Sequence, residues 1–414
     1  MSTTTFRESA RERHRTTRDT TPRRAGAPPD ETFELAKFHA PEVVLGTGSL
    51  AEAGFAAARL GARRPLVVTD PGIIEAGWVD ELIGHLRESG LAPVIWSSVT
   101  PNPRDHEIRA AYARYAEWDC DVIIGIGGGS VADAAKGVAI LSGNGGDILD
   151  YAGVDLITHP IPPLLIIPTT SGTGADVSQF CIVTDTERSV KVTILGRALV
   201  PDISITDPRL LVTMPEDLNA ATGLDALTHG IEAFVSLAHN PLADTHAISA
   251  VGLVCRNLRT TMTTPKEAEA RRKMAQASLQ AGLAFSNAIL GATHAMSHQV
   301  GGLLDAPHGV VNGVLLPHVV RYNARATPER FVELAAAAGL AVRGMPGEEA
   351  AERLADHIRG LADDIGVPRG LKELGVTEED IPRLARTTLD DACLTTNPRL
   401  ASEQEIAELF RNAL

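Results

Sequence analysis

The 414-residue sequence has few cysteines, few aromatic residues and no long hydrophobic run. Its four cysteines lie far apart, so the sequence indicates neither a disulfide framework nor a thiolate metal site. They are Cys120, Cys181, Cys255 and Cys393. A membrane-spanning helix needs roughly 18 consecutive apolar residues, and the longest apolar runs here have only the length of a buried strand. We therefore expect a cytoplasmic protein that does not enter a membrane.

Positive charge is also in short supply. The 38 Lys and Arg residues against 52 Asp and Glu residues give a formal net charge of −14. Proteins that bind nucleic acid usually present a basic surface to the phosphate backbone, so this balance argues against nucleic acid as a partner. With 44% hydrophobic and 22% charged residues, the chain has the composition of an ordinary globular protein, and its length allows two or three domains.

Hydrophobic patterning divides the chain into three parts. Residues 1–33 are rich in Thr and Arg, show no apolar periodicity and are expected to form a disordered tail. Residues 34–210 alternate short apolar runs with helix-period segments, which predicts an α/β domain with a mostly parallel, Rossmann-like sheet. Its candidate strands are residues 65–69, 93–96, 122–126, 164–167 and 181–184. Residues 211–414 contain long Ala-rich amphipathic stretches and should be all-helical, with a ligand cleft between the two domains.

A glycine-rich turn is a candidate anion site. It links the strand at residues 122–126 to a helix predicted over residues 131–141. Glycines allow backbone N–H groups to approach a ligand closely, and the positive end of the helix dipole favours a phosphate there. A glycine triplet is more often a simple tight turn, and Ser130 with Asp133 could merely cap the helix. The residues of the turn are Gly127, Gly128, Gly129 and Ser130.

Two further features at strand ends suit a nucleotide. Asp70 follows the strand at residues 65–69, where a carboxylate can accept hydrogen bonds from an adenosine ribose. In the standard dinucleotide fingerprint the glycines precede the acid, whereas here Asp70 precedes the glycines. An alternative is that Asp70 simply begins a turn. The loop at residues 168–174 offers hydroxyl groups and two glycines, which suit phosphate or ribose contact but are also common in connecting loops.

The strongest chemical pattern lies in the helical half. Asp225 and His229 are four residues apart, and Glu232 follows three residues later, so all three project from one face of a helix. Imidazole and carboxylate groups suit Fe, Zn, Ni or Cu better than Mg or Ca.

A second set of histidines follows in the same half. His294 and His298 repeat the four-residue spacing, and His308 comes ten residues later. Any single histidine is more often an ordinary buried or surface polar group. One Asp and four His in apolar, small-residue helices would, however, be costly to bury without a shared partner. A cation is the simplest partner.

Together these motifs resemble the iron-containing (group III) alcohol dehydrogenase family, over nearly the whole chain from Phe38 to Leu414. The family's landmarks occur in order. They are Gly46-Thr47-Gly48, Val68-Thr69-Asp70, Pro101-Asn102-Pro103, residues 127–130 with Asp133 and Lys136, residues 168–174, residues 223–229, residues 294–308, and Asn397-Pro398-Arg399. The resemblance implies an α/β nucleotide domain, a helical domain of dehydroquinate-synthase-like architecture, and an active site between them.

The resemblance also implies the metal site. The metal would be Fe²⁺, with Zn²⁺ or another divalent ion as options, held by Asp225, His229, His294 and His308. His298 would be the catalytic residue that relays a proton or positions groups near the nicotinamide.

The cofactor contacts follow from the same resemblance. Residues 127–130 would hold the pyrophosphate of NAD, and Asp70 would bind the adenosine ribose and repel the 2′-phosphate of NADP. The other expected contacts are Asn102, Asp133, Thr169, Thr170, Thr173 and Lys191.

The predicted function is a metal-dependent, NAD(H)-linked alcohol dehydrogenase or aldehyde reductase that forms a homodimer or larger homo-oligomer. Its substrate would be a small alcohol or aldehyde, which could carry an acid or phosphonate group if Arg197 or Arg256 reached the cleft. The alternatives are a metal-free reductase like maleylacetate reductase, a lyase like dehydroquinate synthase, and a redox-sensing protein that binds NADH without turnover.

Overall fold

The computed structural model describes residues 36–188 and 190–414, so the tail predicted at residues 1–33 lies outside the described residues. Residues Lys37–Leu414 form one compact unit. Its described strands all precede Asp207, and from Glu216 onward its described regular elements are helices. This arrangement confirms the predicted fold class, a parallel sheet followed by an all-helical region. Because both regions belong to one compact unit, the domain boundary at residue 210 stays a prediction.

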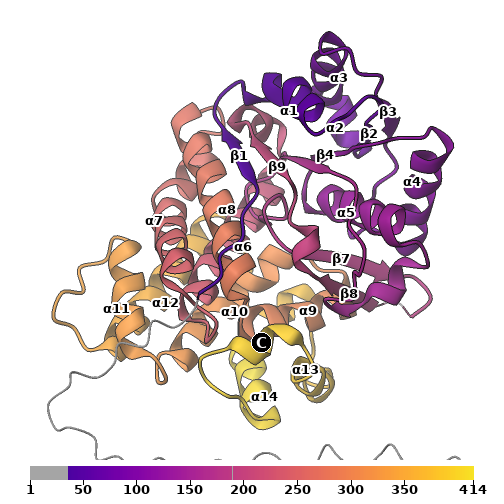
Figure 1. Ribbon diagram of the computed structural model, residues 1–414. Coiled ribbons are helices and arrows are strands. Elements are labelled where there is room, and N and C mark those ends of the chain that lie inside the picture. The colour runs from indigo at the N-terminus through magenta and orange to yellow at the C-terminus, as the bar shows by residue number, and fades with distance from the viewer. Residues whose placement is uncertain (1–35, 189) are drawn as a thin grey trace, which may run out of the picture. The chain divides into compact units, whose positions relative to one another are not determined.

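Six strands form one sheet in which all neighbours are parallel, in the order β1-β9-β6-β4-β2-β3 (Figure 1). The other three form a small sheet in which β7 and β8 are antiparallel and β5 runs parallel to β8. The strands are β1 (Glu42–Leu45), β2 (Leu66–Val68), β3 (Val94–Trp96), β4 (Ile123–Gly127), β5 (Gly153–Val154), β6 (Leu164–Pro168), β7 (Phe180–Asp185), β8 (Val190–Leu195) and β9 (Ile203–Thr206).

Helices cover both faces of the large sheet, as a parallel sheet requires. In the central strand β4, Ile123 packs into the apolar layer that includes α4 and α5, while Ile124 and Ile126 pack into the layer that includes α1 and α3. This alternation follows from the two-residue repeat of a strand. The helices of this half are α1 (Ala53–Arg59), α2 (Pro71–Glu75), α3 (Trp78–Glu88), α4 (Asp105–Glu117) and α5 (Gly129–Asn144).

The second half is built from helices around one apolar core. They are α6 (Glu216–Val235), α7 (Pro241–Thr263), α8 (Ala268–Ala288), α9 (Ala292–Leu304), α10 (His308–Asn323), α11 (Pro328–Ala337), α12 (Gly347–Asp364), α13 (Ile381–Thr388) and α14 (Glu403–Asn412). Short 3₁₀ helices include η1 (Ser49–Glu52), η2 (Ile148–Tyr151), η3 (Arg197–Leu199), η4 (Pro208–Thr213), η5 (Leu371–Leu374) and η6 (Ala392–Thr396). Among the described helices, none combines the length and apolar character that a membrane span requires.

The sequence located four strands of the large sheet, β2, β3, β4 and β6, to within a residue or two. The prediction for residues 181–184 was wrong in one respect: these residues do form a strand, β7, but it pairs with β8 outside the parallel sheet. The parallel sheet is instead completed by β1 and β9, which pair with each other and were not predicted.

Candidate active site

A cleft of about 580 Å³ opens where β2, β4 and β6 end. In open α/β sheets, ligands bind at the carboxyl ends of the strands, which is where this cleft lies. Seven of the predicted cofactor residues line it: Asp70, Gly128, Gly129, Ser130, Thr169, Thr170 and Thr173. The helical half contributes the opposite wall through Met214, Pro215, Leu218 and Thr222. The cleft therefore lies between the two halves, as predicted.

The glycine-rich turn is shaped by close packing. A Cβ atom on Gly127 would lie 2.5 Å from Val131 Cγ2, and one on Gly129 would lie 2.8 Å from Thr173 Cγ2, so larger residues would push these elements apart. Helix α5 begins at Gly129, with Gly128 before it and no side-chain cap on its first turn. The suggestion that Ser130 caps this helix was therefore wrong. Gly129 and Ser130, in the first turn of α5, line the cleft, and the N-terminus of a helix favours an anion.

Asp70 caps a helix and lines the cleft, and its contact with an adenosine ribose stays a prediction. Its Oδ1 accepts a hydrogen bond from Ile73 N at 3.1 Å, so it caps the start of α2. It also lines the cleft beside the glycine-rich turn. The carboxylate is therefore anchored at one oxygen and adjoins the space that a nucleotide would fill.

Asn102 connects the cleft to the helical half. Its backbone N–H donates to Ser130 Oγ at 3.1 Å, its Oδ1 accepts from Lys191 Nζ at 2.8 Å, and its Nδ2 donates to Asp305 Oδ1 at 2.8 Å. Asn102 has a φ of 57°, a left-handed conformation that these bonds help to hold. Asp305 follows α9, three residues before His308, so this chain of hydrogen bonds joins the glycine-rich turn to the segment that precedes His308.

Asp133 and Lys191 do not line the cleft directly. Burial raises the pKa of Asp133 to about 7, although the nearby Lys136 ammonium acts in the opposite direction. Burial lowers the pKa of Lys191 against the effect of the Asp305 and Asp133 carboxylates. Lys191 therefore donates to Asn102 under the influence of two acidic groups, and the predicted cofactor contacts of Asp133 and Lys191 stay predictions.

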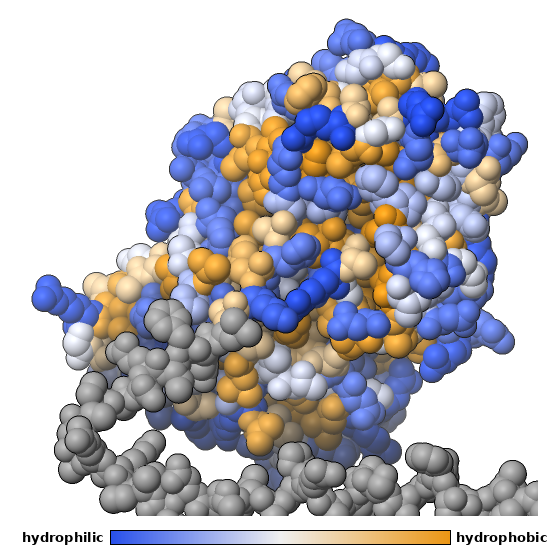
Figure 2. Space-filling view, in the orientation of Figure 1, coloured by the Kyte–Doolittle hydropathy of each residue, from blue (hydrophilic) through white to orange (hydrophobic). Residues whose placement is uncertain are grey.

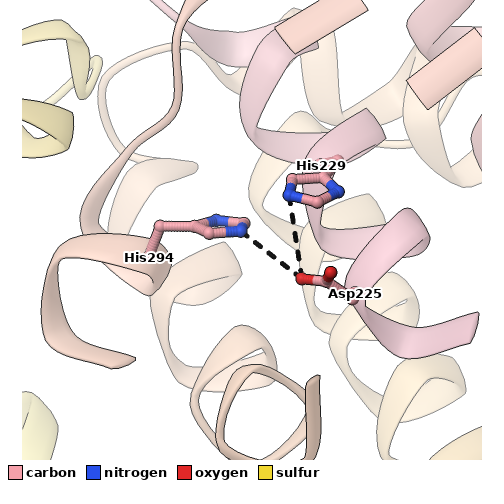
Figure 3. Close-up of side chains that lie close together, drawn as sticks. All are labelled: Asp225, His229 and His294. Atoms are coloured by element: carbon pink, nitrogen blue, oxygen red, sulfur yellow. Dashed lines mark ion pairs between the residues drawn. The ribbon is translucent and has the colours of Figure 1, made fainter. Parts of the chain in front are cut away.

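Four side chains predicted as metal ligands converge on one point. Asp225 Oδ1 lies 3.7 Å from His229 Nε2, 3.6 Å from His294 Nε2 and 3.8 Å from His308 Nε2. Asp225 and His229 come from neighbouring turns of α6, and His294 reaches them from the first turn of α9 (Figure 3). Ligand bonds of about 2.1 Å around a tetrahedral ion place neighbouring ligand atoms roughly 3.4 Å apart. The ligand atoms of Asp225, His229 and His294 all lie within 4.8 Å of one another, which fits a single bound divalent cation. His308 approaches the same Asp225 oxygen from outside this tighter group.

Each of the three histidines directs its other ring nitrogen away from this point. His229 Nδ1 donates to Gly172 O at 3.3 Å, and His294 Nδ1 donates to Glu232 Oε2 at 2.6 Å. His308 Nδ1 lies 3.0 Å from Ser297 Oγ, whose hydroxyl also points toward His308 O. Engagement of Nδ1 turns Nε2 of each ring toward Asp225, which is the orientation that metal-binding histidines have. His294 Nε2 also lies 3.4 Å from Asn312 Nδ2.

The electrostatics of the cluster also suit a cation. Although burial opposes ionisation, the neighbouring imidazoles hold the pKa of Asp225 far below its ordinary value. The pKa of Glu232 is likewise lowered against burial, chiefly by its hydrogen bond with His294. Burial lowers the pKa of His229 to about 4. His294 differs, because its hydrogen bonds with Asp225 and Glu232 raise its pKa to about 9 against the effect of burial. The two ionised carboxylates supply the negative charge that a buried divalent ion requires, and an ion bound there would displace the extra proton of His294.

Close backbone approaches fix the helices that carry these ligands. A Cβ atom on Gly309 would lie 1.9 Å from Ala221 O, so only glycine allows the start of α10 to touch α6. A Cβ atom on Gly172 would lie 2.4 Å from Thr222 Cβ, at the point where the loop after β6 meets α6. These contacts hold α6, α10 and the cleft loop in one arrangement.

His298 belongs to the cluster without pointing at Asp225. Its ring stacks on that of His308, with centroids 5.3 Å apart and 15° between the planes. Its Nδ1 lies 2.9 Å from Asp391 Oδ2. The side chain is 27% exposed, against 2% for His294. His298 therefore has access to water, as has His308 with 33% exposure, whereas His294 is enclosed.

Several groups at the site were not predicted. Asp391, Ser297 and Gly172 orient histidine rings, and the buried Asn312 Nδ2 donates to Asp225 Oδ1 at 2.9 Å. Except for Ser297, which lies inside the 294–298 segment, they are distant in sequence from the rings they touch. Spacing alone could not have found them.

The two arginines considered for an anionic substrate lie elsewhere. Arg197 lines a separate pocket with Phe38 and Asn287, and Arg256 donates to Ala337 O. Neither lines the cleft.

Comparison with known proteins gives a consistent result. Residues 40–208 match the sequence profile described as iron-containing alcohol dehydrogenase, and residues 219–414 match the C-terminal profile of the Fe-containing alcohol dehydrogenase family. The 1,3-propanediol dehydrogenase of Klebsiella pneumoniae is 43% identical over 385 residues, which cover 92% of this chain and 100% of the relative. The NAD-dependent methanol dehydrogenase of Bacillus methanolicus is 38% identical and covers 91% of this chain and 99% of the relative.

The fold agrees with these sequence matches. The crystal structure of a 1,3-propanediol oxidoreductase superimposes with a TM-score of 0.90 and 42% identity, covering 92% of this chain and 100% of that chain. The chain therefore belongs to the iron-containing alcohol dehydrogenase family, and it is an oxidoreductase of that family.

Proposed function

We propose that this chain is a metal-dependent, NAD(H)-linked alcohol dehydrogenase and aldehyde reductase. The observation that carries the proposal is the convergence of three histidine Nε2 atoms on Asp225 Oδ1, next to a cleft at the carboxyl ends of the parallel strands. In the oxidative direction the substrate alcohol loses a hydride to the nicotinamide and a proton to solvent. In the reductive direction both return.

Asp225, His229, His294 and His308 would hold the metal, for which family membership favours Fe²⁺ and the donor set also accepts Zn²⁺. A divalent ion bound there would supply Lewis acidity for a substrate oxygen. The protein supports this by keeping each Nδ1–H engaged, so that the rings cannot rotate away.

The nucleotide would lie in the cleft. Residues 127–130 and the start of α5 would bind the pyrophosphate through backbone N–H groups. Asp70 would accept hydrogen bonds from the adenosine ribose, which favours NAD over NADP. The remaining contacts that we propose are Asn102, Asp133, Thr169, Thr170, Thr173 and Lys191.

His298 would move the proton between the substrate and water. It stacks against the ligand His308, so it adjoins the reacting centre, and it is more exposed than His229 and His294. Its Nδ1 is engaged by Asp391, which leaves Nε2 for proton transfer.

We propose an uncharged small alcohol or aldehyde as the substrate. The cleft lining includes no Lys or Arg among the described residues, and Lys191 is already engaged by Asn102. The residues that line this cleft therefore offer no cationic side chain to an acidic group on a substrate. Relatives named for a propanediol and for methanol are consistent with this choice.

The test is a panel of small alcohols, including 1,3-propanediol and methanol, with NAD and enzyme loaded with Fe²⁺ or Zn²⁺ under anaerobic conditions. The proposal predicts NADH formation that stops when the metal is removed by a chelator and returns when it is restored. Unchanged turnover in excess chelator would support the metal-free reductase instead. Turnover without net change in NADH would support the lyase. Family membership favours neither alternative.

We also propose that the enzyme is a cytoplasmic homodimer or larger homo-oligomer. The four cysteines are buried free thiols, which suits a reducing compartment. Strand β1 lies at the edge of the sheet, with Val43 36% and Leu45 42% exposed. Figure 2 shows hydrophobic residues gathered around the position that β1 has in Figure 1. Light scattering that reports a single chain's mass at micromolar concentration would contradict the oligomer.

A further inference from the structure

His298, Asp391 and Cys393 form a second cluster of polar groups beside the proposed metal site. Asp391 lies directly before η6, far along the chain from α9, which carries His298. Its Oδ2 accepts a hydrogen bond from His298 Nδ1 at 2.9 Å. Its Oδ1 accepts from Cys393 N at 2.9 Å. Both oxygens of the carboxylate are therefore committed to specific donors.

The contacts within this cluster argue against a second metal site. Burial, together with the carboxylates of Asp391 and Glu232, raises the pKa of the Cys393 thiol well above its ordinary value. A protonated thiol is a poor metal ligand, because it is the thiolate that binds. The Asp391 oxygens that would face an ion already accept N–H groups.

Because these contacts argue against a metal, the Asp391 carboxylate serves to hold the His298 imidazole. A carboxylate can only accept, so His298 must carry its proton on Nδ1, and Nε2 is left with a free lone pair. Gln299 Nε2 lies 3.4 Å from the same Asp391 oxygen, which also ties the neighbouring residue of α9 to Asp391. The stacked ring of His308 limits rotation of the His298 ring about its remaining axis.

We propose that Asp391 is a positioning residue for the reaction: its carboxylate fixes the tautomer and orientation of His298, so that Nε2 accepts the proton that leaves the substrate. This inference rests on the proposed role of His298. Asp391 itself does not touch the substrate and acts only through the imidazole.

The Asp391→Asn variant inverts this arrangement without changing the size of the side chain. Cys393 N still requires an acceptor at the inner position, so the amide oxygen stays there and the amide nitrogen faces His298. Nδ1 must then accept, and the proton moves to Nε2. Because positioned acid–base groups contribute about 10²–10⁴-fold to rate, we expect kcat to fall about 100-fold. The KM for the alcohol, the affinity for NADH and the metal content should change less than about threefold.

Two variants provide controls. Asp390→Asn removes the same charge one residue away, at an exposed position, and should keep wild-type kcat. Asp391→Glu keeps the carboxylate and should recover part of the activity that Asp391→Asn loses. NADH fluorescence titration and metal analysis of each purified variant show whether the site is otherwise intact.

The decisive experiment is a double-mutant cycle with His298→Gln. If Asp391 acts through His298, Asp391→Asn should change kcat less than twofold in the His298→Gln background. If the two substitutions instead lower kcat by factors that multiply in the double variant, the inference is overturned. It is also overturned if Asp391→Asn keeps wild-type kcat while His298→Gln is slow. Wild-type kcat in His298→Gln would instead overturn the proposed role of His298, and the inference with it. Absence of any NAD-linked turnover by the wild-type enzyme would be a failure of the proposed function.

Discussion

Replacing Glu232 with Gln tests the support of the metal site without removing a ligand. Glu232 is 2% exposed and lies on α6, three residues after His229. Its carboxylate accepts three hydrogen bonds at the start of α9: from Gly291 N at 3.0 Å, Thr293 N at 2.6 Å and His294 Nδ1 at 2.6 Å. Glu232 therefore holds both the N-terminal end of α9 and the ring of His294 in place.

The expected magnitude follows from these contacts. A Gln side chain has one acceptor oxygen in place of two, and its NH₂ group would face an N–H donor. Loss of a partner that orients a ligating histidine lowers metal affinity about 10–100-fold, which corresponds to roughly 1.4–2.7 kcal/mol. A buried donor left without an acceptor adds about 1–3 kcal/mol of lost folding stability. Both effects should therefore be measurable.

The assay is chelator competition with Zn²⁺-loaded protein, followed by metal analysis after desalting. Glu232→Gln should release its metal at a chelator concentration about 10–100-fold lower than the wild type does. Glu216→Gln is the matched control, because it removes an exposed carboxylate from the first turn of the same helix. Equal retention of metal by wild type and Glu232→Gln, within twofold, would refute the account of how His294 is held.

Three further changes test other parts of the site and fold. Asp70→Gly should raise the rate with NADPH relative to NADH, since the repelling carboxylate is lost; steady-state kinetics that still exclude NADPH would argue against the ribose contact. Asp305→Ala breaks the bond to Asn102 Nδ2, worth about 1 kcal/mol, and should raise the KM for NADH roughly fivefold. Asp207 is buried, yet Arg209 holds its pKa below the ordinary value. Its folded pKa is therefore the lower one, and its stabilisation is full above about pH 4 and is lost as pH falls through the folded pKa. Asp207→Asn should consequently lower the Tm more at pH 7 than at pH 3.

The sequence predicted the parts of the fold that depend on local pattern. β4 and β6 are continuous apolar runs, as strands buried on both faces must be, and both were located. β1 was missed because its residues, Glu42–Leu45, lie at an exposed edge and show no buried run. β7 was placed in the wrong sheet because its pairing with β8 is a long-range choice that strand propensity does not encode.

The site residues also divide into those that a local sequence pattern predicts and those that it does not. Asp225 and His229 are recognisable because four-residue spacing on a helix brings them to one face. The groups that orient the ligand rings come from unrelated segments: Gly172 from the loop after β6, and Asn312 from α10. Asp391 reaches His298 only through the packing of the C-terminal helices against α9. Such partners come together only in the tertiary structure, so no local sequence pattern predicts them.

The most direct measurement is anomalous X-ray diffraction from crystals of the metal-loaded, active enzyme. The account predicts one peak per chain, enclosed by the Asp225 carboxylate and the Nε2 atoms of His229, His294 and His308. Active crystals with no peak at that position, or with these imidazoles directed away from one another, would contradict it.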